Sequence, residues 1–223
     1  MKKILLTAVM LLCIVATLCA CGKTAPPAAS SETAVEVPEA VVIRPLENPM
    51  DLEMLSDCTL AVSIKEGDVY KDEEGNLQMK ATVYTYDVYD MVDIAALKEG
   101  DTVERLGEEV TVSTVERRDD GAVIINGGIE NGGFELICHD TTVFYETREN
   151  DAKAYYALGE VVLPVADTFV FTDARDLDKD PMHYTASEML AEDANIEYHF
   201  VPSNAQIILE GGVVTALQRV YIP

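Results

Sequence analysis

Tryptophan is absent from this chain of 223 residues, and histidine occurs only three times. The patterns H-E-x-x-H and C-x-x-C do not occur, so the usual local spacings of zinc ligands are missing. The sequence also has no G-x-S-x-G nucleophile elbow and no glycine-rich phosphate-binding loop. It therefore lacks the common signatures of metalloenzymes, α/β-hydrolases and nucleotide-binding proteins.

Basic residues are scarce as well. The chain has 16 Lys and Arg against 40 Asp and Glu, which gives a formal net charge of −24. Such a charge repels phosphate backbones and anionic lipid headgroups, which excludes nucleic acid as an expected partner. It is compatible with cations, with basic partners, or with a role in solubility alone.

Long apolar runs are limited to the N-terminus. Lys2 and Lys3 precede an uncharged, mostly apolar stretch at residues 4–18. That stretch is too short to span a bilayer, and its layout is typical of a secretory signal peptide. No later segment reaches the apolar length that a membrane-spanning helix needs.

The end of this signal has a specific pattern, Leu18, Cys19, Ala20 and Cys21. It resembles the lipobox of bacterial lipoproteins, in which an aliphatic residue, a tolerant position and a small residue precede a cysteine. The resemblance implies that signal peptidase II removes residues 1–20 and that Cys21 carries a diacylglyceryl group, with palmitate among its acyl chains. It also implies a location on the outer face of the cytoplasmic membrane, because two acyl chains anchor a protein stably.

Cysteines in the rest of the chain are few. Once residues 1–20 are removed and Cys21 is lipidated, only Cys58 and Cys138 remain. Outside the cytoplasm these two could form a disulfide, or both could be buried thiols. Residues 21–50 are rich in Pro, Ala and Ser, which predicts a disordered tether. The segment AVVIRPL within it could add an edge strand to the following domain.

Residues 51–223 alternate between apolar and polar residues over many short stretches. Turn sequences such as Glu74-Gly75-Asn76, Asp119-Asp120-Gly121 and Glu210-Gly211-Gly212 separate these stretches. We expect an α+β, mainly β fold with antiparallel barrel- or sandwich-like sheets. One domain is expected, and two lobes divided near residue 148 are an alternative.

Two or three short helices are expected among these strands. One follows Asp93 and ends by Gly100, and a second runs from an N-cap at Asn150 to Gly159. The third is expected at 185–193. There, Thr185 and Glu188 are spaced as a capping box, in which each side chain bonds the other residue's backbone N–H.

Four aspartates, Asp173, Asp176, Asp178 and Asp180, precede this capping box. Positions 176, 178 and 180 have the alternate spacing of the first calcium ligands in an EF-hand loop. However, Pro181 stands where that loop needs glycine, and the bidentate glutamate is displaced by one position. The stretch is therefore either a weak Ca²⁺ site or a charged turn whose carboxylates favour a helix N-terminus.

These observations predict a membrane-anchored extracytoplasmic lipoprotein that displays an acidic, β-rich domain for binding a protein or glycan partner. No catalytic residues are assigned from the sequence. Two alternatives remain open. A surface hydrolase would need two facing carboxylates, and a calcium-stabilised structural domain would need the four aspartates to converge.

Overall fold

The structure, a computed structural model, describes residues 39–46, 50–138, 143–149, 152–191 and 196–222. Residues 39–223 form one compact unit. Most of the described chain is β-strand, with two short α-helices and one 3-10 turn. The expected α+β, mainly β class is confirmed.

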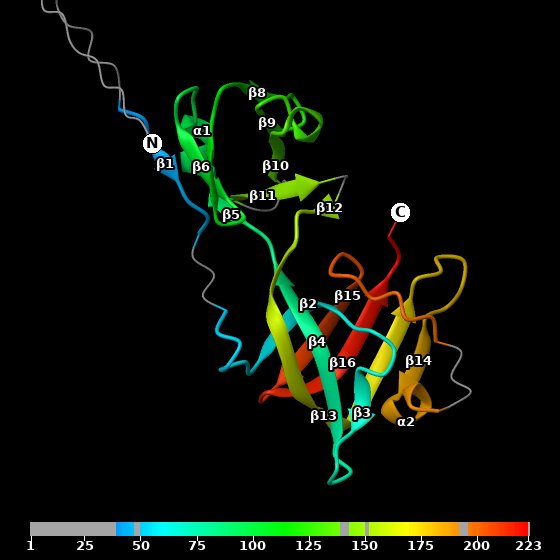
Figure 1. The fold of residues 1–223 in the computed structure, drawn as a ribbon. Coiled ribbons are helices and arrows are strands. Elements are labelled where there is room, and N and C mark those ends of the chain that lie inside the picture. The colour runs from blue at the N-terminus through cyan, green and yellow to red at the C-terminus, as the bar shows by residue number, and fades with distance from the viewer. Residues whose placement is uncertain (1–38, 47–49, 139–142, 150–151, 192–195, 223) are drawn as a thin grey trace, which may run out of the picture. The chain divides into compact units, whose positions relative to one another are not determined.

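Five strands close a barrel in the lower part of Figure 1. In order around its wall they are β2 (Cys58–Ser63), β4 (Leu77–Thr85), β13 (Tyr156–Ala174), β16 (Val213–Val220) and β15 (Ala205–Glu210). Strand β15 then pairs with β2, which completes the circle. Two short strands, β3 (Val69–Lys71) and β14 (Met182–Thr185), extend the sheet at β4 and β13.

The connectivity of this barrel has a recognisable form. If its strands are numbered one to five along the chain, their order around the wall is 1-2-3-5-4. The third and fifth strands, β13 and β16, are parallel, whereas the other neighbours are antiparallel. A short helix lies between the third and fourth strands. This is the strand order of the OB-fold, a five-stranded Greek-key barrel.

The barrel interior follows from strict alternation along the strands. Side chains of a strand point to opposite faces, so every second residue enters the core. Val62, Val83, Phe171, Ile207 and Leu217, one from each barrel strand, are fully buried in a single apolar cluster. Their neighbours along the chain face outward.

Residues 86–155 are an insertion between two strands that pair directly. Thr85 at the end of β4 lies opposite Tyr156 at the start of β13. The insertion contains β5 (Val88–Asp90), α1 (Met91–Ala96), β6 (Thr102–Arg105), β7 (Glu108–Thr111), β8 (Val115–Arg117), β9 (Val123–Ile125), η1 (Ile129–Asn131), β10 (Phe134–Cys138), β11 (Phe144–Glu149) and β12 (Ala152–Lys153). It has an apolar core of its own, which includes Tyr89, Ile125, Phe134 and Leu136.

The N-terminal part of the described chain joins this insertion. Strand β1 (Val42–Ile43) pairs in parallel with β6, and Ile43 enters the insertion's core. The prediction that AVVIRPL supplies an edge strand is confirmed. Position 148, considered above as a division between two lobes, lies inside β11.

The expected turns are confirmed. Gly75, Gly121 and Gly211 all have positive φ in the connections β3–β4, β8–β9 and β15–β16. Glycine tolerates this conformation because it has no Cβ. The repeated Asn-Gly-Gly sequence lies in the β9–β10 connection, where Asn126 also has positive φ.

The helix predictions had mixed success. Helix α2 (Ala186–Met189) starts where predicted, with both hydrogen bonds of the capping box between Thr185 and Glu188. Helix α1 begins earlier than predicted, because the carboxylate of Asp90 accepts a hydrogen bond from the Val92 N–H. Neither helix is long and apolar enough to cross a membrane, and the described residues contain no other α-helix.

The helix predicted from Asn150 to Gly159 is wrong. Its described residues belong to β12 and to the start of β13, which pairs with β4. Pairing with a long neighbouring strand outweighs the local helix preference of Ala and Leu. Asn150 itself lies outside the described residues.

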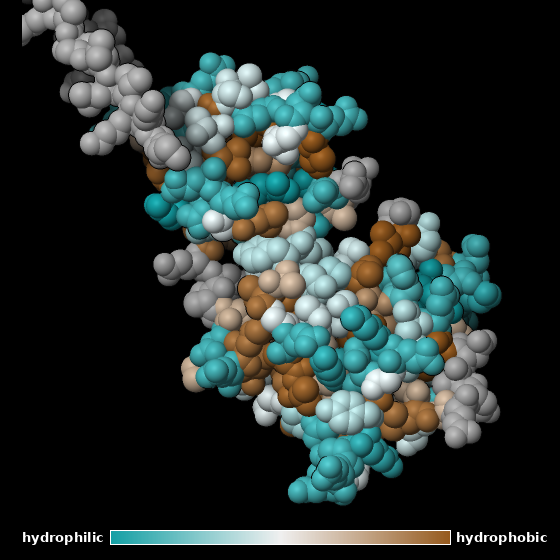
Figure 2. All heavy atoms as spheres, in the orientation of Figure 1, coloured by the Kyte–Doolittle hydropathy of each residue, from teal (hydrophilic) through white to brown (hydrophobic). Residues whose placement is uncertain are grey.

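Hydrophobic side chains also reach the surface. Figure 2 shows them scattered among hydrophilic ones over both the barrel and the insertion. Val162 and Val170 on β13 are 55% and 39% exposed. Both point outward because their neighbours on the strand fill the barrel core.

Candidate functional site

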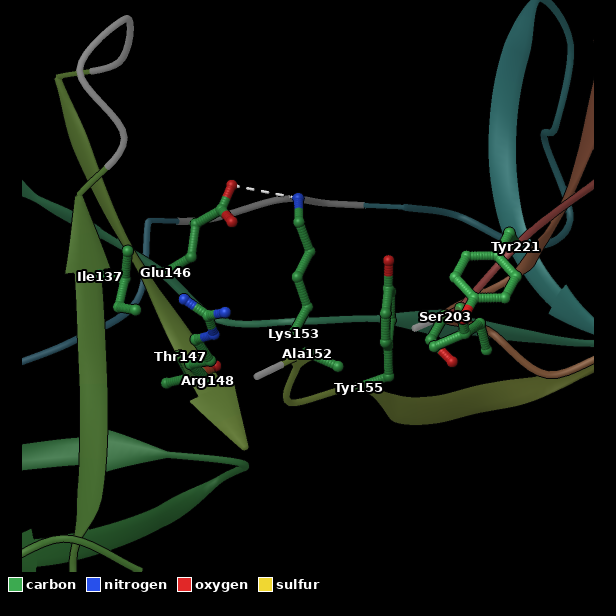
Figure 3. A pocket seen from close by; sticks show the side chains of 10 residues that line it. Ile137, Glu146, Thr147, Arg148, Ala152, Lys153, Tyr155, Ser203 and Tyr221 are labelled. Atoms are coloured by element: carbon green, nitrogen blue, oxygen red, sulfur yellow. Dashed lines mark hydrogen bonds and ion pairs between the residues drawn. The ribbon is translucent and has the colours of Figure 1, made fainter. Parts of the chain in front are cut away.

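A groove of about 310 Å³ lies beside the outer face of the β10–β12 sheet (Figure 3). Small-ligand sites in proteins measure about 300–1,000 Å³, so this groove is at the lower end of that range. Its described lining residues are Ile137, Glu146, Thr147, Arg148, Ala152, Lys153, Tyr155, Ser203, Tyr221 and Ile222. They come from three strands of the insertion, from the start of the chain's return to the barrel, and from the barrel's C-terminal end.

Strand register explains why this face of the sheet is polar. Ile137 lies opposite Glu146, and the preceding pair is Leu136 opposite Thr147. Leu136 is fully buried in the insertion's core, so the Ile137–Glu146 pair faces the other way, toward the groove. The sheet therefore presents a mixed apolar and charged surface here.

Lys153 is the centre of the groove's hydrogen-bond network. Its Nζ donates to the Tyr86 hydroxyl at 2.6 Å and to Glu146 Oε1 at 3.1 Å. Figure 3 shows the Glu146 carboxylate and the Lys153 ammonium group directed toward each other. The ammonium also lies 3.9 Å from the centroid of the Tyr86 ring, and Tyr155 contacts that ring edge-on at 5.5 Å between centroids.

The charge on Lys153 is stabilised by these contacts. Burial alone would lower the pKa of Lys153, but the hydrogen bonds with Tyr86 and Glu146 outweigh burial and raise it. Lys153 therefore remains a cation at neutral pH. Burial raises the pKa of Tyr155, so its phenol stays neutral and can donate or accept a hydrogen bond.

The chemistry of the groove suits binding. An ammonium group has three N–H donors, and Tyr86 and Glu146 take two of them. No third acceptor for Lys153 is present among the described residues, which leaves one donor for a ligand. Tyr155 and Tyr221 offer rings and hydroxyls, and Ile137 and Ile222 offer apolar surface.

Paired carboxylates are not brought together in this groove. Glu146 is the one carboxyl group among its described lining residues. A glycosidase of the usual kind needs a second carboxylate across the cleft. The groove therefore gives no support to the alternative of a carboxylate hydrolase.

The four aspartates of the acidic stretch have separate roles. Asp173 is buried in the barrel, where its carboxylate accepts hydrogen bonds from Arg219 Nε at 2.9 Å and Nη2 at 2.5 Å. Burial alone would raise the pKa of Asp173, but the bonds and charge of Arg219 outweigh it and lower the pKa. Asp176 accepts a hydrogen bond from Lys179 Nζ at 2.5 Å, and Asp178 and Asp180 are exposed.

Within the described ranges, no three His, Cys, Asp or Glu side chains are grouped so that they could hold a metal ion. The Thr185–Glu188 capping box occupies the Glu188 carboxylate, and its hydrogen bonds from Thr185 lower the pKa of Glu188. A Ca²⁺ site at these aspartates stays a prediction.

The remaining predicted residues are in different parts of the chain. Cys58 is half-buried in β2, and Cys138 is half-buried at the end of β10 in another sheet. No disulfide joins them in the part of the chain that the structure describes. Cys21 and its signal peptide lie outside the described residues.

Sequence reasoning missed the principal groove residues. Lys153 and Tyr86 are 67 positions apart in the chain. Lys153 and Tyr155 were assigned to the incorrect helix, and only Tyr86 stood out, as one of two tyrosines at strand spacing. No local pattern could have joined Glu146, Lys153 and Tyr221.

Comparison with protein-family models, with curated proteins and with solved structures finds no match to this chain. The groove and the barrel therefore provide the arguments about function.

Proposed function

We propose that this protein is a lipid-anchored, extracytoplasmic binding module that holds a protein or glycan ligand in the groove around Lys153. The acyl chains on Cys21 anchor it to the membrane, and residues 22–38 connect the anchor to the domain. The module is non-catalytic. The observation that carries the proposal is the Lys153 ammonium, held between Tyr86 and Glu146 beside aromatic and apolar side chains.

Support for the anchor comes from the sequence. The apolar stretch at 4–18 follows two lysines and ends in Leu18-Cys19-Ala20-Cys21. Two acyl chains are sufficient for stable attachment without a spanning helix. The first described strand, β1, begins close to this tether, so the insertion is the first part of the domain after the anchor.

Support for binding comes from the composition of the groove. Small-ligand sites combine apolar and aromatic surface with a few positioned polar groups. The groove contains two tyrosines, two isoleucines and a fixed cation, and the protein as a whole has a net charge of −24. A positively charged group in such an acidic molecule selects for a ligand that offers hydrogen-bond acceptors at this point.

The anchor is tested by growing bacteria that express the full chain with an alkyne-tagged palmitate. We expect label on the wild-type chain and on Cys19→Ser, and none on Cys21→Ser. Label on all three chains, or on none of them, would contradict the assignment of Cys21.

Binding is tested by saturation-transfer NMR with a panel of neutral oligosaccharides and short peptides. We expect signals that disappear in Lys153→Met and Tyr155→Ala. Tyr70→Ala is the matched control, because Tyr70 lies on β3 and does not line the groove. Binding that is equal in all variants would show that the groove is not the site.

A further inference from the structure

The outer wall of the barrel carries a row of uncharged side chains that crosses six strands. Strand pairing aligns His183, Thr172, Gln218, Gln206, Ala61 and Tyr84 in this order from β14 to β4. The residues between this row and the next, including Phe171, Leu217, Ile207 and Leu60, are buried in the core. The row therefore faces outward.

A second row runs parallel to the first. It consists of Thr185, Val170, Ala216, Ile208 and Thr59, again aligned by strand pairing. Charged residues make up 25% of the chain, yet neither row contains one. We call the two rows together the uncharged wall. Charged residues return at its edge, where Glu210 follows Ile208 by two positions and Asp57 precedes Thr59 by two.

The polar groups on the uncharged wall are held in place by one another. Thr172 Oγ1 and His183 Nδ1 are 3.1 Å apart, and Gln206 Nε2 donates to Gln218 Oε1 at 2.7 Å. Fixed side chains lose less conformational entropy when a partner covers them. An uncharged centre with charged residues at the edge is also the usual composition of a protein–protein interface.

We propose that the uncharged wall is the contact surface between two copies of this chain. The argument for a second copy is electrostatic. Two molecules that each carry a charge of −24 repel each other at most relative orientations. A two-fold contact places the same patch of each copy against the other, so this wall meets itself without burying an unpaired charge.

The same argument predicts an unusual dependence on salt. Added salt shortens the Debye length from about 30 Å at 0.01 M to about 8 Å at 0.15 M. Screening weakens the repulsion between the acidic copies and leaves the neutral contact intact. Self-association should therefore strengthen with salt, whereas attraction to a basic partner would weaken.

Sedimentation equilibrium of the chain from residue 21 onward, with Cys21→Ser to prevent lipidation, tests the proposal. We expect a monomer–dimer equilibrium whose Kd falls more than about tenfold between 0.01 M and 0.15 M salt. A monomer at all salt concentrations, or a dimer that dissociates as salt rises, would overturn the proposal. A monomer that binds a neutral polysaccharide through the wall would overturn it too.

A pair of variants on one strand locates the contact. Val170→Asp adds a charge to the wall and should abolish the dimer. Val162→Asp adds the same charge on the outer face of β13 beside Lys80 and should leave the dimer intact. A dimer that persists in Val170→Asp would place the contact elsewhere. If Val170→Asp fails to fold, Gln206→Glu, at an exposed position of the first row, gives the same test.

Discussion

Arg219 and Asp173 form a two-pronged ion pair inside the barrel, with both side chains almost completely buried. The guanidinium also donates to the backbone carbonyl of Glu197 and lies over the rings of Phe171 and Phe200. This pair joins β13 to β16, the two parallel strands of the barrel. It gives Asp173 a structural role.

We expect Arg219→Met to reduce the free energy of unfolding by about 3–5 kcal/mol, because it leaves the Asp173 carboxylate buried without a partner. The double variant Arg219→Met with Asp173→Leu should be less destabilised than the sum of its single variants. Urea denaturation measures each value. Arg118→Met is the control, since the Arg118–Asp120 pair is exposed and should contribute less than about 1 kcal/mol. Additive effects at 219 and 173 would contradict the pairing.

The same pair makes stability depend on pH. The pKa of Asp173 is lowered in the folded protein, so folding favours the ionised carboxylate. Its contribution is fully present above the unfolded-state pKa of about 3.9 and is lost as pH falls through the lower folded-state value.

Urea denaturation from pH 7 down to pH 2 measures this effect. Asp173→Asn removes the titrating group and leaves Arg219 without a counter-charge. We expect the wild type to exceed this variant in stability at pH 7, with a difference that shrinks as pH falls below about 4. A difference that is constant over this range would show that Asp173 does not gain stability from ionisation.

Gly133, directly before β10, is expected to tolerate no side chain. A Cβ at this position would lie 1.9 Å from the carbonyl oxygen of Ile125. The backbone of β9 would have to move, so Gly133→Ala should cost about 3 kcal/mol or more. Gly75→Ala is the control: it also adds one methyl group, but its Cβ meets open space and only its positive φ opposes the change. That variant should cost about 1–2 kcal/mol, and thermal melts compare the two.

Calcium is expected to have no effect on the thermal melt. The carboxylates of Asp173 and Asp176 are engaged by Arg219 and Lys179, and Glu188 completes the capping box. A site that binds only the folded state and is filled at 100 times its Kd would add about 2.7 kcal/mol. Melts in EDTA and in excess Ca²⁺ should therefore coincide. An increase in Tm that disappears in Asp178→Asn would instead establish a cation site.

The strands and turns were predictable because their signals are local. Alternation of apolar and polar residues marked the strands, and glycines such as Gly121 marked the turns. The order of the strands was not predictable. The pairing of Thr85 with Tyr156 spans a whole insertion, and the sequence near either residue contains nothing that specifies it.

The site was harder to predict for the same reason. Counting aspartates suggested a metal ligand at Asp173, whose true partner, Arg219, is 46 positions away. The groove depends on Lys153 meeting Tyr86 across 67 positions. A side chain's role follows from its partner in space, which composition and spacing do not identify.

The most direct test of the central claim is photo-crosslinking of the anchored protein in living cells. A photoreactive amino acid replaces Tyr155 in the groove or, as the control, Tyr70 on β3. We expect an ultraviolet-dependent adduct from position 155 and none from position 70, because the ligand occupies the groove around Lys153. No adduct at 155, or equal adducts at both positions, would contradict the groove as the binding site.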